Sequence, residues 1–378
     1  MENDAARQIL TRKSEMSFIN NRVRYRLGIM RQITIDGQLI NDNSPPFVIA
    51  EIGHNHQGNL DSALKLIRAA ASAGASAAKF QKRNNKNLFT PELYSQPYNS
   101  ENAFGKTYGE HREALEFGLD EYKTCILEAK RLGITFFATA FDFDSADFLS
   151  NLEMPAFKIA SGDLQNIPLL KYIAKMNVPM IISTGGSTFK MISEAVDAVR
   201  TVHNQVAILQ CTASYPAAYD QLNLSVISNL RETYPDNIVG YSGHENGIAM
   251  PVVAYTLGAR IIEKHFTLNR TLKGTDHAFS LEPQGMQKMV RDLGRAALSL
   301  GDGEKKVYDT ELAPIKKMGK MIVASRNLPI GHKITESDIE FRSPANGIPP
   351  GATGQILGKV LNSSVNMYDP IIFENLKI

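Results

Sequence analysis

Short apolar runs alternate with helical stretches through most of this sequence, and this alternation limits its possible folds more than any other feature. Eight such runs occur, at 47–53, 77–82, 135–140, 156–161, 179–184, 206–211, 237–242 and 260–266. The segments between them have the spacing of amphipathic helices, for example 60–74 and 120–133, which both end at a glycine. Eight evenly spaced units, followed by a helix from about Gly285 to Leu300, predict an α/β fold, a closed TIM (β/α)8 barrel rather than an open doubly wound sheet.

The segments that flank this pattern predict a second, smaller domain. Residues 1–30 show no period and are assigned to an N-terminal extension, whereas 31–40 place β-branched residues around Asp36-Gly37, a strong hairpin signal. We therefore expect the barrel domain, with this hairpin, over 31–300. Residues 301–318 lack apolar periodicity and are predicted to be a linker, and 319–378 combine short β-branched runs with turn residues, which predicts a small β-rich domain.

Composition narrows the class of protein further. The chain of 378 residues carries 41 Lys and Arg against 39 Asp and Glu, so its net charge of +2 gives no sign of a nucleic acid or membrane-surface partner. Its apolar runs stay well below the roughly 18 residues that a membrane span needs. The two cysteines, Cys125 and Cys211, argue for a reducing compartment. We expect a soluble cytoplasmic protein that acts on small molecules.

Two histidines close neighbouring strands of the predicted barrel. His244 ends the run NIVGYSGH and His265 ends RIIEKHF, with a helical segment between them. Parallel strands joined in this way usually lie side by side, so both imidazoles would meet at the same end of the barrel and bind one metal ion. The alternative is that each histidine is only a hydrogen-bonded structural residue.

Most other strands also deliver a polar side chain near the carboxyl end, where a TIM barrel places its active site. These residues are Glu51, Lys79, Gln81, Thr139, Lys158, Ser161, Ser183, Ser242 and Glu263. The lysines and hydroxyls predict a pocket for a small, highly anionic ligand such as a phosphorylated carboxylate, although either lysine alone would also suit a solvated strand end. The two glutamates would serve as acid/base groups, or Glu263 would hydrogen-bond a metal-binding histidine.

Two loops are placed to cover this end of the barrel. Asp276 and His277 follow the eighth strand, in KGTDHAFSLEP. The connection at 82–111 is too long for a simple turn and is interpreted as a lid or substrate loop. Its basic residues Lys82, Arg83 and Lys86 would bind a second phosphate or would simply be solvated.

The order of these motifs resembles the sialic acid synthase family, which condenses phosphoenolpyruvate with N-acetylmannosamine or its 6-phosphate. The matching segments run from about residue 31 to the end and comprise AEIGHNHQG (50–58), AKFQK (78–82), FKIASGD (157–163), ISTGG (182–186), QCTASYP (210–216), GYSGHE (240–245), EKHFT (263–267) and the final LGKVL. GKTYGEH (105–111), QCTASYP, GYSGHE and SLEP (280–283) are more similar to the vertebrate-type enzymes, which use the 6-phosphate.

The resemblance implies a role for each matched residue. His244 and His265 would bind a divalent metal, Mn²⁺ or Mg²⁺, and with Glu51 and Glu263 they would form the catalytic set. Phosphoenolpyruvate would contact Lys79, Thr139, Lys158, Ser161, Ser183 and Ser242. The sugar would contact Glu51, Gln81, Tyr215, Glu263 and Asp276. In the family the metal polarises the open-chain aldehyde, C3 of phosphoenolpyruvate attacks it, water adds at C2 and phosphate leaves by C–O cleavage.

The C-terminal segment resembles the antifreeze-like (SAF) domain, which in the family caps the barrel of a partner subunit in a domain-swapped homodimer. Arg342, in FRSPANG, matches the arginine that reaches the partner's sugar, but the residues after it depart from the bacterial RPG pattern. Gln210 and Ala213 also differ from bacterial relatives, which have His and Asn there. These departures leave the acyl group of the sugar open.

Three alternatives remain at this point. In the first, the enzyme makes a related nonulosonate of the legionaminate, pseudaminate or KDN type. In the second, it is a Schiff-base pyruvate aldolase that uses Lys158. In the third, the protein is not an enzyme but binds ice, and the polar residues at the strand ends then have no common purpose. The sequence does not decide whether the sugar substrate carries a 6-phosphate, which metal is used in the cell or what the N-terminal extension does.

Overall fold

The computed structural model describes residues 31–377. The predicted extension at 1–30 therefore lies outside the described residues. Within them the chain divides between Gly301 and Asp302 into two compact units. The first contains the strand and helix alternation, and the second contains the SAF-like segment.

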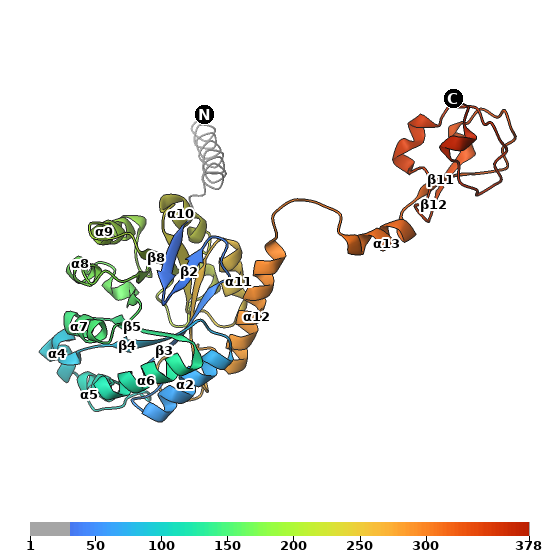
Figure 1. Ribbon diagram of the computed structural model, residues 1–378. Helices are drawn as coiled ribbons and strands as arrows, with labels where there is room; N and C mark the ends of the chain where they lie inside the picture. Colours follow the sequence, from blue (N-terminus) through green and yellow to red (C-terminus); the bar gives the residue numbers. More distant parts are fainter. Residues whose placement is uncertain (1–30, 378) are drawn as a thin grey trace. The chain divides into compact units, whose positions relative to one another are not determined.

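Eight parallel strands of the described chain close into a barrel (Figure 1), as the spacing of the apolar runs predicts. They are β3 (Phe47–Gly53), β4 (Ala77–Lys82), β5 (Thr135–Ala140), β6 (Phe157–Ile159), β7 (Met180–Ser183), β8 (Val206–Cys211), β9 (Ile238–Gly243) and β10 (Ile261–His265). Each strand pairs with the next in sequence, and β10 pairs with β3 so that His265 lies opposite Glu51. This last pairing excludes the open sheet and brings the first and last strand ends together.

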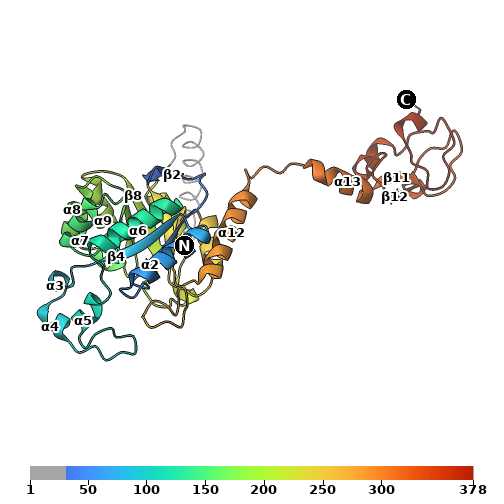
Figure 2. The same ribbon diagram turned by 60° about the horizontal axis from the view of Figure 1, so that its bottom comes forward.

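Helices cover the outside of the barrel (Figures 1 and 2). They are α2 (Leu60–Ser72), α6 (Leu119–Leu132), α7 (Phe143–Asn151), α8 (Ile167–Ala174), α9 (Phe189–Arg200), α10 (Val226–Thr233), α11 (Ala249–Thr256) and α12 (Pro283–Leu300). In α2 the buried residues Ala63, Leu66, Ile67 and Ala70 form one stripe with helical spacing, which packs toward the strands. Because every residue of β3 and β5 is buried, these strands read as continuous apolar runs rather than alternating ones.

The predicted hairpin forms from β1 (Gln32–Ile35) and β2 (Gln38–Asn41). Asp36 and Gly37 both have positive φ, 51° and 74°, which is what a two-residue hairpin turn of the favoured hand requires. Thr135, the first residue of β5, donates a hydrogen bond to Asp36 over 3.0 Å. The hairpin therefore lies at the amino-terminal end of the barrel, opposite the strand ends that carry the polar side chains.

The long connection after β4 is more ordered than its sequence suggests. It contains α3 (Asn85–Leu88), α4 (Pro91–Ser95) and α5 (Tyr108–Glu113), which Figure 2 shows grouped together beyond the end of β4. Thr90 caps α4 by accepting a hydrogen bond from the Leu93 amide, and Thr107 forms a reciprocal capping box with Glu110 in α5. These local caps order short helices that show no apolar period.

The second unit has its own small core. It comprises α13 (Asp309–Met318) and the antiparallel pair β11 (Met321–Ala324) and β12 (Ile339–Arg342), with the predicted β-rich character. Ile322, Leu328, Ile356 and Ile371 are among its buried residues. The stretch expected to be only a linker thus contains the helix α13. None of the residues of α13 is buried, so this helix has no apolar face that a sequence pattern would reveal.

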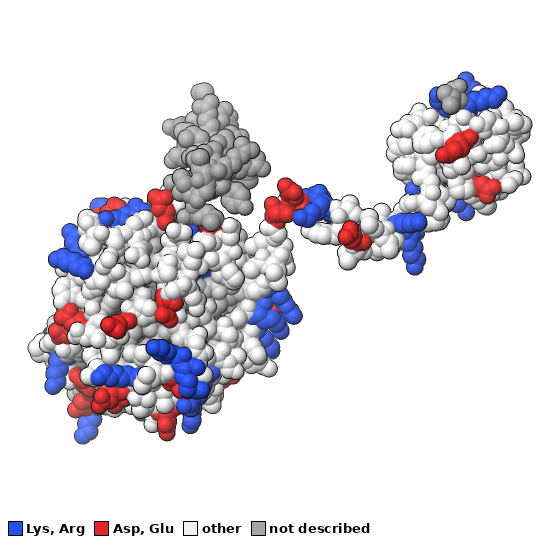
Figure 3. All heavy atoms as spheres, viewed as in Figure 1, with Lys and Arg blue, Asp and Glu red and all other residues white. Residues whose placement is uncertain are grey.

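Acidic and basic side chains are interspersed over the face of the barrel unit drawn in Figure 3. Among residues 31–377, no helix has both the length and the apolar composition of a membrane span.

Gly240 gives a test of the packing in the barrel. A Cβ atom at this position would lie 2.3 Å from Cδ2 of Leu209 and 2.5 Å from the carbonyl oxygen of Ile261, on the two neighbouring strands. We expect Gly240→Ala to lower the free energy of unfolding by about 1–3 kcal/mol through overpacking. Gly294 in α12 has open space around it, so Gly294→Ala should stabilise by about 0.5–1 kcal/mol. Thermal unfolding compares both with wild type, and an unchanged midpoint for Gly240→Ala would contradict this packing.

Candidate active site

A cavity of about 620 Å³ lies at the carboxyl ends of the barrel strands. It is built by residues from almost every strand end and from the loops that follow them. Among the residues singled out in the sequence as site residues, those on its wall are Glu51, Lys79, Gln81, Arg83, Lys158, Ser161, Ser183, Ala213, Tyr215, Ser242, His244, Glu263, His265 and Asp276. The closed barrel therefore gathers into one cavity side chains that are up to 225 residues apart in sequence.

Two lysines and two glutamates form a buried charge network on this wall. Lys79 Nζ lies 2.6 Å from Glu51 Oε2 and 3.8 Å from Glu263 Oε2. Lys158 Nζ lies 3.7 Å from Glu263 Oε1. All four side chains are at most 6% exposed, so each charge depends on the opposite one for compensation.

Hydroxyl and amide groups complete the hydrogen bonds of this network. Lys79 donates to Thr139 Oγ1 over 2.9 Å, and Lys158 donates to Ser183 Oγ over 2.6 Å. Ser242 donates to Glu263 over 3.1 Å, and Gln81 donates to Glu51 over 2.7 Å. Thr139 is the one member that lies behind the wall, where it orients Lys79.

The environment separates the pKa values of the two glutamates. Burial raises the pKa of Glu51, an effect that Lys79 only partly offsets. Burial acts in the same direction on Glu263, but Lys158 and Lys79 outweigh it and hold the pKa of Glu263 below its ordinary value. Of the two carboxyl groups, Glu51 is therefore the one that holds a proton more readily, whereas Glu263 favours its ionised form.

Ser161 and Gly185 form a polar corner next to Lys158. The Gly185 amide donates to Ser161 Oγ over 2.9 Å. A Cβ atom on Gly185 would lie 2.8 Å from both Ser161 Oγ and the Ala213 Cβ, so a larger residue would fill this corner. The corner, the two lysines and the hydroxyls of Ser183 and Ser242 together present the donors that a small anionic ligand requires.

His244 and His265 meet at the cavity, with ring centroids 5.3 Å apart. Their strands are adjacent, since Glu263 of β10 pairs with Ser242 of β9. His244 Nδ1 lies 2.9 Å from the Thr212 carbonyl oxygen and donates to it, which leaves Nε2 free for a ligand. Among residues 31–377, the buried His265 Nδ1 has no hydrogen-bond partner, and its nearest acidic atom is Asp276 Oδ2 at 3.7 Å.

These two imidazoles fit a divalent metal. Burial lowers the pKa of each to about 4, so both are neutral at physiological pH, as metal ligands must be. Among residues 31–377, no set of three or more His, Cys, Asp or Glu side chains is arranged around a common metal position. A metal held here by two histidines would keep open positions for substrate and water.

Two arginines lie on the outer wall of the cavity. Arg83 donates to Gln81 Oε1 over 2.7 Å and its guanidinium lies 3.7 Å from the ring centre of Phe141. Burial and the neighbouring Arg112 lower the pKa of Arg83 to about 10, which leaves it charged. Within the described chain, neither arginine lies within ion-pair distance of a carboxylate. Their charge is therefore available to a ligand.

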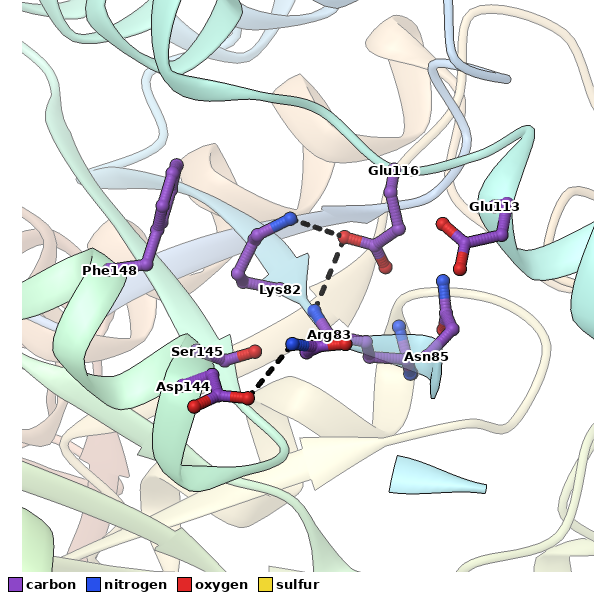
Figure 4. Close-up of a pocket in the computed structure, with 9 residues that line it drawn as sticks. Lys82, Arg83, Asn85, Glu113, Glu116, Asp144, Ser145 and Phe148 are labelled. Atoms are coloured by element: carbon purple, nitrogen blue, oxygen red, sulfur yellow. Dashed lines mark hydrogen bonds and ion pairs between the residues drawn. The ribbon is translucent and has the colours of Figure 1, made fainter. Parts of the chain in front are cut away.

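The three basic residues of the predicted lid have different surroundings. Figure 4 shows Lys82 directed toward Glu116, in a neighbouring pocket of about 290 Å³, where the two side chains lie 3.1 Å apart. Lys86 is exposed. Only Arg83 of the three reaches the cavity.

Other residues of the cavity escaped sequence reasoning. Asn102, Arg112, Phe141, Cys211 and Thr275 line it. Asn102 Oδ1 accepts a hydrogen bond from the Gly274 amide over 2.9 Å, so the lid contacts the loop after β10 across the mouth. The available signal for Arg112 is that this basic residue directly follows the motif GKTYGEH (105–111).

Arg342 is not among the residues that the barrel gathers. It lies on β12 in the second unit, where it is paired with Glu340 over 2.8 Å and its guanidinium lies 3.7 Å from the ring centre of Tyr368. Its role toward a partner's sugar stays a prediction.

Comparison with known proteins places these features in a family. The family model described as NeuB matches residues 66–305, and the SAF domain model matches 319–373. The chain is 39% identical over 339 residues to N-acetylneuraminate-9-phosphate synthase of Homo sapiens, covering 89% of this chain and 94% of that protein. It is 37% identical over 317 residues to N,N'-diacetyllegionaminic acid synthase of Campylobacter jejuni, covering 83% and 95%.

A solved structure agrees with these matches. N-acetylneuraminic acid (sialic acid) synthetase from Leptospira borgpetersenii, crystallised with citrate, superposes with a TM-score of 0.67 at 34% identity, over 76% of this chain and 95% of that one. With its family model, its curated relatives and its closed barrel in agreement, the chain belongs to the NeuB family of sialic acid synthases, enzymes of the synthase type, and carries a C-terminal SAF domain.

Proposed function

We propose that this enzyme condenses phosphoenolpyruvate with N-acetylmannosamine 6-phosphate to give N-acetylneuraminate 9-phosphate and inorganic phosphate. The observation that carries the proposal is the single cavity in which Lys79 and Lys158 lie beside the histidine pair. One part of that cavity suits a compound with a phosphate and a carboxylate. The other part suits the activation of an aldehyde.

Phosphoenolpyruvate binds in the inner part of the cavity. Lys79 and Lys158 compensate its charges, and Ser161, Ser183 and Ser242 donate hydrogen bonds to its oxygens. Both lysines are held in place beforehand, by Thr139 and Ser183. Such preorganised donors cost little reorganisation when the ligand arrives.

His244 and His265 hold Mn²⁺ or Mg²⁺ next to this ligand. A divalent ion bound there supplies Lewis-acid polarisation of the sugar aldehyde. The support for this assignment is the neutral state of both imidazoles and the unpartnered Nδ1 atom of His265.

The glutamates divide the remaining chemistry. A carbon–carbon bond forms between C3 of phosphoenolpyruvate and the aldehyde carbon, and Glu51, with its raised pKa, gives a proton to the aldehyde oxygen. Glu263 remains ionised and stabilises the positive charge that develops at C2. Water adds at C2, the C–O bond to phosphate breaks, and a 2-keto acid and inorganic phosphate result.

The unpaired arginines support a phosphorylated acceptor. Arg83 and Arg112 provide two guanidinium groups at the outer wall, and no carboxylate of residues 31–377 lies within ion-pair distance of either, which suits a dianionic phosphate. The relatives do not decide this, because synthases named for different products have similar identities to the chain, 39% and 37%. Legionaminate, pseudaminate or KDN-type products are the other outcomes of the test below.

The proposal extends to assembly and location. We infer a domain-swapped homodimer in which Arg342 reaches the sugar site of the partner subunit, an inference that rests on resemblance to the family. Two free, buried cysteines, Cys125 and Cys211, agree with a cytoplasmic location.

One observation favours a Schiff-base aldolase as the second candidate. Burial lowers the pKa of Lys158, as imine formation requires. Treatment with borohydride and pyruvate would trap the imine in that enzyme, whereas the proposed synthase should keep its full activity after the same treatment.

Phosphate release from phosphoenolpyruvate tests the acceptor. With Mn²⁺ present, we expect release with N-acetylmannosamine 6-phosphate to exceed release with the unphosphorylated sugar, and EDTA to stop both. Equal or greater activity with the unphosphorylated sugar would contradict the phosphate-binding role of the arginines. Activity only with a diacetamido sugar would move the chain to a different nonulosonate.

Arg112→Met tests the arginine pair directly. Loss of a charge-assisted contact should raise the KM for the phosphorylated sugar roughly 10- to 100-fold, with the KM for phosphoenolpyruvate little changed. Lys86→Met removes an exposed charge from the same lid and is the matched control, expected to match wild type. Steady-state kinetics that show equal effects of the two substitutions would refute the assignment.

His265→Ala tests the metal pair. We expect metal-dependent phosphate release to fall by roughly a thousandfold or more, because a Lewis acid stabilises the transition state by several kcal/mol. His203→Ala, outside the cavity in the turn before β8, is the control. Wild-type turnover in His265→Ala would remove this histidine from the metal site.

A further inference from the structure

A second buried ion pair lies directly behind the two histidines. Lys264 Nζ is 3.1 Å from Glu245 Oε1, and these side chains are 1% and 0% exposed. Lys264 also donates to the backbone carbonyl of Glu245, and the Tyr241 hydroxyl donates to Glu245 Oε2 over 2.6 Å. Neither charged residue lines the cavity, and the proposed chemistry uses neither.

The sequence positions of this pair tie it to the histidines. Glu245 follows His244, and Lys264 precedes His265. Since Glu263 and His265 face the cavity, alternation along β10 directs Lys264 to the opposite side, beneath the helices. The pair therefore joins the ends of β9 and β10 from outside the barrel.

The ladder between these strands ends just before the histidines. The last paired residues are Gly243 and Lys264, so the ladder itself does not hold His244. Beyond this point the Glu245 carboxylate returns toward Gly243, where an added Cβ atom would lie 2.5 Å from Glu245 Oε2. Glycine at 243 leaves the space that the carboxylate occupies.

A buried ion pair is a poor source of stability, because desolvation of two charges offsets their attraction, and apolar residues would fill the same space. What such a pair does provide is a fixed geometry, since each charged group is strongly held to its partner. Here the ion pair fixes the backbone at Glu245 and Lys264. Each of these residues is next in sequence to one of the two histidines that must converge on one ion.

We propose that Glu245 and Lys264 are positioning residues that set the separation of His244 and His265 and thereby the affinity of the site for its divalent metal. This inference rests on the proposed function, because it requires that the histidines bind a metal. The hydrogen bond from the Tyr241 hydroxyl helps to hold the Glu245 carboxylate in this position.

Binding of Mn²⁺ to the metal-free, full-length enzyme, measured from the electron paramagnetic resonance signal of free Mn²⁺, tests the proposal. We expect Lys264→Met to weaken Mn²⁺ binding roughly 10- to 100-fold, as loss of outer supports does at other metal sites. Phosphoenolpyruvate binding without metal, followed by calorimetry, should stay within about twofold of wild type because Lys79 and Lys158 are unchanged. Tyr241→Phe is the milder variant, with a smaller loss in the same direction.

The double variant Lys264→Met with Glu245→Gln separates positioning from stability. It removes both charges, keeps the net charge and should recover most of the thermal stability that Lys264→Met loses. Under the proposal its Mn²⁺ affinity stays low. Recovery of wild-type affinity together with stability would show that the pair is only structural and would overturn the proposal.

Asp42→Asn is the matched control. Asp42 pairs with Arg31 and Arg231 over 2.9 Å and 2.7 Å at the hairpin end of the barrel. This substitution should lower thermal stability without changing Mn²⁺ affinity, and a loss of affinity here would also count against the proposal. If wild-type enzyme binds no Mn²⁺, the metal assignment itself fails, whereas equal binding by wild type and Lys264→Met refutes only the positioning role.

Discussion

The cost of burying charge is the constraint on which the rest of the site depends. Lys79, Lys158, Glu51 and Glu263 lie inside a closed barrel, where an unpaired charge would be strongly destabilising. Their mutual compensation lets the barrel keep two lysines on the cavity wall, while burial raises the pKa of Glu51 and the two lysines hold the pKa of Glu263 below its ordinary value. In the proposed function, substrate binding and proton transfer thus depend on one network.

Outside this network, the proposed function assigns the choice of acceptor sugar to the two arginines of the cavity wall. Arg83 and Arg112 lie where the lid meets the barrel, and a ligand phosphate would satisfy both. The inner residues belong to strand ends and the arginines to the lid or its junction with β4, so under the proposed function the acceptor sugar would be able to change while the phosphoenolpyruvate site stays the same.

The sequence predicts the barrel well because buried parallel strands are apolar runs with polar residues at their ends, and closure by β10 on β3 then places Glu51 beside His265. The sequence does not predict the direction in which each individual side chain points. Arg83 reaches the cavity whereas its neighbour Lys82 lines only the adjacent pocket, and α5 carries Arg112 inward through packing that no local pattern encodes. Lys264 looks like one more polar strand end, although alternation directs it behind the barrel to a buried partner that only the fold supplies.

The most direct test of the account follows the bridging oxygen of phosphoenolpyruvate. With ¹⁸O between C2 and phosphorus, the accepted sugar and Mn²⁺, the isotope shift in the ³¹P resonance of released phosphate reports which bond breaks. Attack by C3, addition of water at C2 and C–O cleavage predict that the label leaves with inorganic phosphate. Unlabelled phosphate would mean P–O cleavage and would contradict the proposed roles of Lys79, Lys158 and Glu263.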